Sequence, residues 1–193
     1  MVKNHKKEQT MKKILLAISV IMTIGSAVAG CGSGTPEQTR QKTATITFSA
    51  MSTASLPTAI SGVQISAKLP AGVSVFLQPG SANQISSSAL ASAKPNGFIL
   101  GSYSSSIRQV TIAVADNAQP PKGLGFGNIG DFATLECTFS PSLTLTEDSF
   151  LGINQTFPDF KATGVFKNMS GTRIIGTVDL TNKLKPSMRV TIN

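Results

Sequence analysis

The chain has 193 residues, 13% of them charged, and a formal net charge of +8. This length suffices for a short export signal and one domain with its own core. Half of the net charge lies before residue 31, and the later Lys and Arg residues form no run, which excludes a nucleic-acid-binding stripe. The rest is rich in Ser, Thr, Gly, Val and Ile, which is typical of β-proteins with many turns and argues against long amphipathic helices.

The first 30 residues have the pattern of a secretory signal. Lys12 and Lys13 precede an apolar run over residues 14–28, and small residues follow it. The run is shorter than the roughly 20 residues that a membrane-spanning helix needs. We therefore expect residues 1–30 to be a signal peptide that is removed, with translation starting at Met1 or Met11.

The signal ends in Val28-Ala29-Gly30-Cys31, which resembles the lipobox of bacterial lipoproteins. The resemblance implies that Cys31 is lipidated and becomes the first residue of the mature chain. Two or three acyl chains give stable anchoring where one does not. Gly32 in place of Asp implies sorting to the outer membrane, with the leaflet left open.

A tether and a strand-rich domain are predicted after Cys31. Residues 31–42 lack apolar periodicity and predict a flexible tether, so the folded domain is expected over residues 43–193. Alternating and β-branched stretches predict about eight to ten short strands. The expected strands are Thr43–Phe48, Val63–Leu69, Val73–Leu77, Gly97–Tyr103, Ile107–Ala115, Asp131–Phe139, Phe160–Phe166, Arg173–Leu180 and Met188–Ile192.

The segments between these strands carry further expectations. The turn residues Pro70-Ala71-Gly72 predict that Val63–Leu69 and Val73–Leu77 form a strand pair. Likewise, Gly97–Tyr103 and Ile107–Ala115 predict a hairpin. Ile85–Ala93 is rich in Ser and Ala and predicts a short helical turn, whereas residues 117–130 predict a long loop. Thr146 is expected to cap a short helix with an acidic first turn. Asn182 to Pro186 is expected to separate the last two strands.

Few residues of the mature chain could carry chemistry. His5 is the only histidine and is lost with the signal, which removes Ser-His and Cys-His dyads and histidine metal sites. Cys137 alternates with apolar residues, so we expect a buried structural thiol. The GxGxxG of residues 125–130 follows Pro120-Pro121 and precedes a strand, a context that does not fit a dinucleotide site. We expect no cofactor, no metal and no enzyme.

A carboxylate pair of the glycosidase kind remains as the one catalytic alternative, because its spacing in space cannot be read from the sequence. The carboxylates available for it are Asp116, Asp131, Glu136, Glu147, Asp148, Asp159 and Asp179.

Many short strands without intervening helices predict an all-β antiparallel sandwich. Ile60 to Val73 resembles the opening of cohesin-like domains, and Val110–Ala115 with Gly130–Phe139 is similar to their late strands. The resemblance covers Thr43 to Phe166 and implies a jelly-roll sandwich related to the cellulose-binding superfamily.

Cohesins bind dockerin modules through one sheet face, so the resemblance implies a non-enzymatic module that docks a protein at the cell envelope. We keep two alternatives. One is polysaccharide binding by polar side chains near Tyr103, although the chain has no Trp. The other is a structural subunit of an envelope complex.

Overall fold

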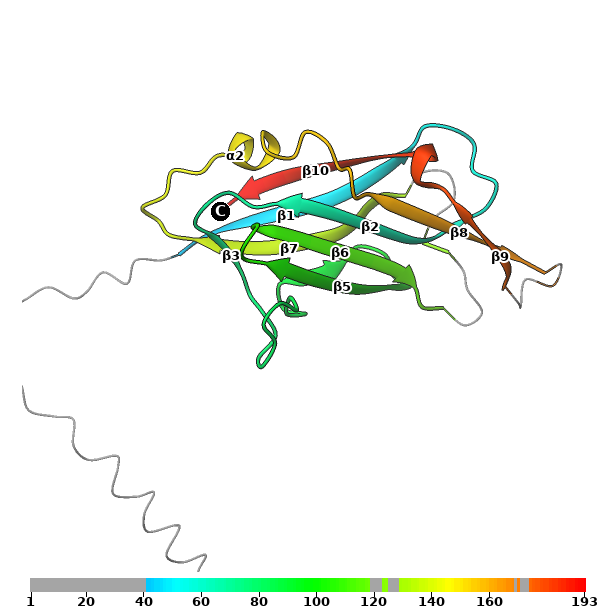
Figure 1. The fold of residues 1–193 in the computed structure, drawn as a ribbon, viewed down its shortest axis with the longest axis horizontal. Coiled ribbons are helices and arrows are strands. Elements are labelled where there is room, and N and C mark those ends of the chain that lie inside the picture. The colour runs from blue at the N-terminus through cyan, green and yellow to red at the C-terminus, as the bar shows by residue number, and fades with distance from the viewer. Residues whose placement is uncertain (1–40, 119–122, 125–128, 169, 171–173) are drawn as a thin grey trace, which may run out of the picture. The chain divides into compact units, whose positions relative to one another are not determined.

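The computed structural model describes residues 41–193 except 119–122, 125–128, 169 and 171–173. Within this part of the chain, two antiparallel β-sheets pack face to face (Figure 1). The predicted signal peptide, Cys31 and the predicted tether except its last two residues lie outside the described residues, and strand β1 already begins at Lys42. The prediction of an all-β sandwich is therefore confirmed for the domain that follows them.

Each sheet has five strands, and the order mixes early and late segments. Sheet A runs β10 (Leu184–Ile192), β1 (Lys42–Ser52), β7 (Gly130–Phe139) and β3 (Val73–Val75), with β4 (Leu90–Ser92) also paired to β7. Sheet B runs β5 (Gly97–Ser104), β6 (Gln109–Asp116), β2 (Ile60–Lys68), β8 (Lys161–Lys167) and β9 (Ile174–Asp179). Two short helices, α2 (Glu147–Leu151) and η1 (Thr181–Lys183), lie between strands.

The core is the space between the two sheets, filled by the inward rows of the strands. On β1, Ala44, Ile46 and Phe48 are fully buried and alternate with hydroxyl side chains, as period-two patterning requires. On β7, the predicted inward row that includes Cys137 is buried as expected. Burying one such Val, Leu, Ile or Phe side chain contributes roughly 1.5–3 kcal/mol, so these rows hold the sheets together.

Helix α2 closes one margin of the sandwich and begins where the sequence predicts. The backbone N–H of Thr146 donates to the Ser149 hydroxyl at 3.1 Å, and Phe150 is fully buried. Just after the helix, the Asn154 carboxamide donates to the carbonyls of Lys68 and Phe150 and accepts the N–H of Lys68, each at 2.8 Å. Asn154 thereby ties the end of α2 to the end of β2.

The predicted pair of strands on either side of Pro70-Ala71-Gly72 is wrong. β2 pairs with β6 and β8 in sheet B, whereas β3 pairs with β7 in sheet A. The turn between them crosses from one sheet to the other, with Gly72 at a φ of +80°. Leu69 and Val73 on its two sides are both buried, so the crossing places an apolar side chain in the core from each sheet.

The predicted helical turn over Ile85–Ala93 is reduced to a single hydrogen-bonded turn, in which the N–H of Ala89 donates to the Ser86 carbonyl at 3.0 Å, and the two ends of the segment are extended. Ile85 forms an isolated bridge with Leu77, and Leu90 begins strand β4 opposite Leu135 of β7. Ile85 and Leu90 are both buried, and pairing with β7 outweighs the high helix propensity of the three alanines, which the four less favourable serines dilute.

The separator predicted from Asn182 to Pro186 is shorter than expected. β10 begins at Leu184, and Pro186 lies inside it opposite Ala50. β10 is an edge strand that pairs with β1 on one side, and an edge strand tolerates proline because one side needs no backbone donor.

Candidate functional site: a groove along the edge strand β5

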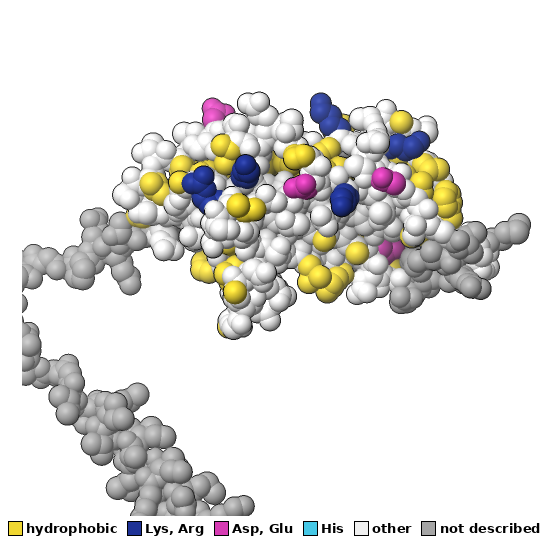
Figure 2. Space-filling model, in the orientation of Figure 1, with side chains coloured by type: hydrophobic (Ala, Val, Ile, Leu, Met, Phe, Trp, Pro, Cys, Tyr) yellow, Lys and Arg dark blue, Asp and Glu magenta, His cyan; other side chains and the backbone are white. Residues whose placement is uncertain are grey.

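The outer face of sheet B is built from small, mostly uncharged side chains. The residues of β6 that point outward are Thr111, Ala113 and Ala115, and they lie opposite Ser66, Gln64 and Gly62 of β2. The hydroxyls of Ser66 and Thr111 are 2.9 Å apart and join the two strands across this face. Figure 2 shows the face as a largely white surface with scattered charges and with hydrophobic side chains along its lower border.

The edge strand β5 borders this face and exposes large apolar side chains. Phe98 and Leu100 point outward and are 52% and 50% exposed. The alternate residues point inward, where Gly97 and Gly101 allow close packing. A Cβ at Gly101 would lie 2.5 Å from a methyl carbon of Leu90, so only glycine fits there without displacement. Strand β5 thus has two glycines on its core side and large apolar side chains on its solvent side.

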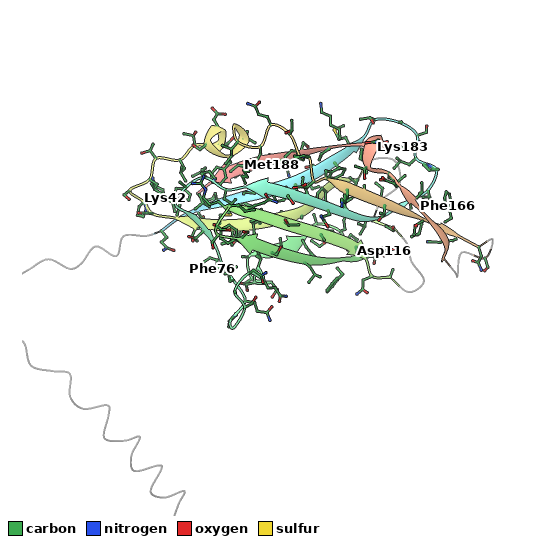
Figure 3. All side chains as sticks on the ribbon, viewed as in Figure 1. Lys42, Phe76, Asp116, Phe166, Lys183 and Met188 are labelled. Atoms are coloured by element: carbon green, nitrogen blue, oxygen red, sulfur yellow. The ribbon has the colours of Figure 1, made fainter. Side chains whose placement is uncertain are left out.

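A hairpin that we call the flap (residues 76–86) covers part of the free edge of β5 (Figures 1 and 3). The N–H of Gln78 donates to the Gln84 carbonyl at 2.8 Å, and Gly80 in the turn has a φ of +81°. Phe76 at the base of the flap is 51% exposed. Pro79-Gly80 between two short extended segments is the sequence signal that could have revealed this hairpin.

The flap pairs with the second half of β5. The N–H of Ile85 donates to the carbonyl of Gly101 at 2.9 Å, and the N–H of Tyr103 donates to the carbonyl of Asn83 at 2.7 Å. Beyond Ser86 the chain turns away toward β4, with the N–H of Ser86 bonded to the Phe76 carbonyl at 2.8 Å. The first half of β5 is left outside this pairing.

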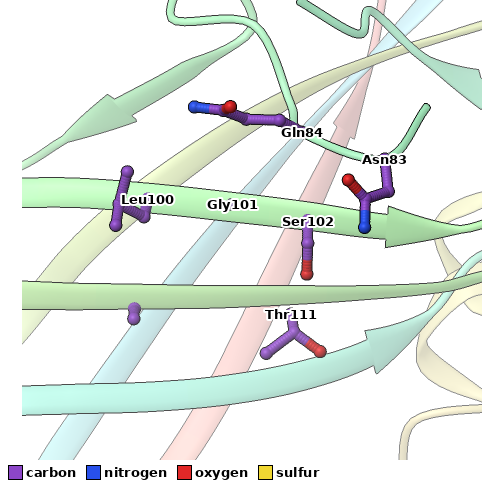
Figure 4. Close-up of a pocket in the computed structure, with 7 residues that line it drawn as sticks. Asn83, Gln84, Leu100, Gly101, Ser102 and Thr111 are labelled. Carbon is purple, nitrogen blue, oxygen red and sulfur yellow. The ribbon is translucent and has the colours of Figure 1, made fainter. Parts of the chain in front are cut away.

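Three adjoining pockets follow β5 from the flap to its start. One of about 350 Å³ lies on the outer face, with Leu100, Gly101 and Ala113 as its floor and Asn83, Gln84, Ser102 and Thr111 around it (Figure 4). One of about 450 Å³ lies beside the strand edge, and one of about 300 Å³ lies at Gly97 and Phe98. Gln84, Leu100 and Gly101 line both of the first two, and Phe98 lines both the second and the third, so we treat the three pockets as one groove.

The groove carries no charge among its lining residues. The side chains that line the three pockets are apolar, amide or hydroxyl groups. An ion pair lies away from the groove on sheet A, where Arg189 contacts both carboxylate oxygens of Asp131 and Ser49 donates to the same group. These hydrogen bonds to Arg189 and Ser49 lower the pKa of Asp131.

The candidate carboxylates are distributed over both sheets and α2. Asp131 and Glu136 lie on β7, Glu147 and Asp148 on α2, and Asp179 at the end of β9, where Thr181 lowers its pKa by hydrogen bonding. Asp116 accepts the N–H groups of Ala118 and Gly123 at 3.0 and 2.5 Å and so orders the start of the β6–β7 loop. Asp159 lines a separate pocket of about 170 Å³ beside Lys68. In the described residues, no group of three His, Cys, Asp or Glu side chains has metal-binding geometry.

Two other candidate residues lie away from the groove surface. Tyr103 is partly buried and packs against the core, so its ring does not form a platform for sugars. Cys137 is fully buried, and desolvation raises its pKa to about 12, which keeps the thiol protonated and unreactive.

The GxGxxG motif falls partly outside the described residues. Gly130, its last residue, has a φ of +57° and begins strand β7. A dinucleotide fingerprint needs a helix to follow the last glycine, because the helix N-terminus binds the pyrophosphate. The strand that follows here is the context that the sequence predicted.

The comparisons with known proteins found no match. No protein-family model, curated protein or solved structure matches this chain. Over the described ranges, none of the helices is long and apolar enough to cross a membrane.

Proposed function

We propose that the chain is an envelope lipoprotein whose sandwich is a non-enzymatic, cohesin-like module that docks another protein through the β5 groove and the outer face of sheet B. In this proposal Cys31 carries the lipid, residues 31–42 are the tether, and the outer membrane is the anchoring site. The lipobox resemblance of Val28–Cys31 supports the anchor.

The strand order supports the jelly-roll, cohesin-like part of the proposal. Neighbours in both sheets come from distant parts of the chain, as with β1 beside β7 and β2 beside β8. Such an order is expected when Greek-key connections link two sheets. The segments that resemble cohesins correspond to β2, β6 and β7.

The observation that carries the docking proposal is the pair Phe98 and Leu100, half exposed beside an uncharged groove. Large apolar side chains that cluster on a surface mark interaction sites. Aromatic and aliphatic anchors with few charges are also the composition of protein–protein interface cores. A partner that covers these two side chains removes apolar surface from water without having to desolvate a charge.

A photo-crosslinking experiment on the full chain in its native envelope tests this proposal. A benzophenone amino acid replaces Leu100 in one variant and Met51 in a matched control, because Met51 is 58% exposed but lies on β1 of sheet A. We expect a discrete crosslinked protein from position 100 and none from position 51. Equal products from both positions, or none from position 100, would overturn the proposal.

The lipid anchor has its own test. In a Cys31→Ser variant, we expect the protein to leave the membrane fraction or to remain unprocessed, and the mature wild-type chain to carry the mass of its acyl chains at residue 31. An unmodified Cys31 in the purified mature chain would contradict the anchor.

Polysaccharide binding remains the second candidate because four polar side chains surround the pocket of about 350 Å³, namely Asn83, Gln84, Ser102 and Thr111. Amide and hydroxyl groups of this kind can hydrogen-bond sugar hydroxyls. Retention of envelope glycans by the wild-type chain, lost in an Asn83→Ala variant, would favour this candidate over protein docking. A structural subunit role would instead give the same crosslinks from many surface positions.

A further inference from the structure

The backbone of β5 offers unused hydrogen-bonding groups at its free edge. Strand β5 pairs with β6 through alternate residues. The N–H of Asn117 donates to the Asn96 carbonyl at 2.9 Å, so the even-numbered residues of β5 are the ones that bond to β6. By this alternation the N–H and C=O groups of Phe98, Leu100 and Ser102 face β6. Those of Ile99 and Gly101 face the opposite side.

The flap uses only part of this edge. The carbonyl of Gly101 accepts the Ile85 N–H, whereas the structure shows no hydrogen-bond partner among the described residues for the N–H and C=O of Ile99. At Gly97, a local turn satisfies the edge, with the N–H bonded to the Lys94 carbonyl at 2.9 Å. The open position is therefore centred on Ile99, between Gly97, whose N–H is bonded, and Gly101, whose carbonyl is bonded.

The pocket of about 450 Å³ lies beside this open position. Ile99 lines it from β5, and Ser86 and Ser87 line it from the point where the flap leaves the strand. An exposed strand edge is a template for another strand, and peptides commonly bind proteins by strand addition. An added segment would continue the line of the flap strand, Asn83–Ile85, along β5.

We propose that an extended, uncharged segment of the partner protein adds as a strand to β5, exchanging backbone hydrogen bonds with Ile99. This inference rests on the proposed docking function and specifies its mode. The residue opposite Ile99 points inward, so the residues on either side of it point outward, beside Phe98 and Leu100. Those two positions of the segment are apolar, and the absence of charge among the groove-lining residues selects an uncharged segment.

The flap disfavours a second copy of this chain as the occupant. A two-fold axis at Ile99 would place Gly97 of the second copy against Gly101 of the first. The carbonyl of Gly101 already accepts the N–H of Ile85. A segment of about three residues fits the interval that the flap leaves open.

The test uses a capped tripeptide, Leu-Thr-Leu, which matches the length of the open interval and is labelled with a dye through a glycine spacer. Its binding to the purified, detergent-solubilised chain is measured by fluorescence anisotropy. Methylation of the central threonine nitrogen removes the donor to the Ile99 carbonyl, and we expect about tenfold weaker binding for the loss of about 1 kcal/mol or slightly more. Methylation of a leucine nitrogen, which faces away from β5, is the matched control and leaves the affinity within about twofold.

A pair of protein variants makes the same test from the other side. Ile99→Pro removes the edge N–H without touching the β6 ladder, and Ile99→Ala shortens the side chain but keeps the donor. We expect Ile99→Pro to bind the peptide about tenfold more weakly than Ile99→Ala, with circular dichroism showing that both are folded.

The outcomes separate this inference from the proposed function. Equal affinity for the two methylated peptides, or equal affinity of the two variants, overturns strand addition. If that occurs while position 100 still crosslinks one protein, docking stands and its mode is different. A self-associating chain whose dimerisation is lost in Ile99→Pro would replace the partner segment by a second copy and would also overturn the proposal.

Discussion

The buried thiol of Cys137 allows a sharp test of the core packing. Its pKa is raised to about 12 by desolvation, from an ordinary value of 9.0. At pH 8 this lowers the thiolate fraction from roughly 9% to about 0.01%, a thousandfold change. We therefore expect a disulfide reagent such as dithionitrobenzoate to label native Cys137 at least a thousandfold more slowly than the urea-unfolded chain. Residual labelling would proceed through opening of the sandwich.

The assay reports on Cys137 alone, because the chain has two cysteines and lipidation of Cys31 would block the other thiol. Unfolded chain should then release one equivalent of reagent anion. Because the folded-state pKa lies above the unfolded one, ionisation favours the unfolded state, and we expect stability to fall as pH rises above about 9. Native labelling within tenfold of the unfolded rate would refute the burial of Cys137.

Three further outcomes follow from the contacts. Asn154→Ala leaves three backbone groups without their partner, the buried carbonyl of Phe150 and the part-buried N–H and carbonyl of Lys68. We expect a loss of about 2–4 kcal/mol in urea unfolding, and a loss below about 1 kcal/mol would contradict the bonding. Gly101→Ala overpacks the contact between β5 and β4, and we expect a loss of about 1–3 kcal/mol, with Gly101→Ser no better tolerated; wild-type stability would refute the close approach. Asp131→Asn removes the ion pair with Arg189. Because the folded state lowers the pKa of Asp131, we expect the variant to be less heat-stable than wild type at pH 7 and this difference to disappear as pH falls below about 4. A difference that does not depend on pH would be inconsistent with the ion pair.

The sequence predicted most strands because their signal is local. Alternation over Asp131–Phe139 predicted strand β7 and the burial of Cys137. The predicted hairpin of Gly97–Tyr103 and Ile107–Ala115 corresponds to β5 and β6. The Thr146 cap located α2 for the same reason, since capping depends on neighbours within one turn. The lipobox prediction at Cys31 falls outside the described residues and stays a prediction.

The groove could not be predicted in this way. Its floor comes from β5 and β6, one wall comes from the flap, and Leu90 of β4 determines why Gly101 must be small. The outward pattern of Phe98 and Leu100 was visible as alternation with Gly97 and Gly101, but alternation alone does not say which face is covered. Tyr103 packs against the core, and the expectation of a sugar site formed by polar side chains near it stays a prediction.

By itself, the sequence determined that this chain forms a strand-rich domain, because composition and period-two alternation are properties of neighbouring residues. The tertiary structure decided which strands are partners, that β2 and β3 belong to different sheets, and that β5 keeps an open edge at Ile99. These features depend on strands far apart in the chain, and their pairing is chosen by how the two sheets bury their apolar faces together.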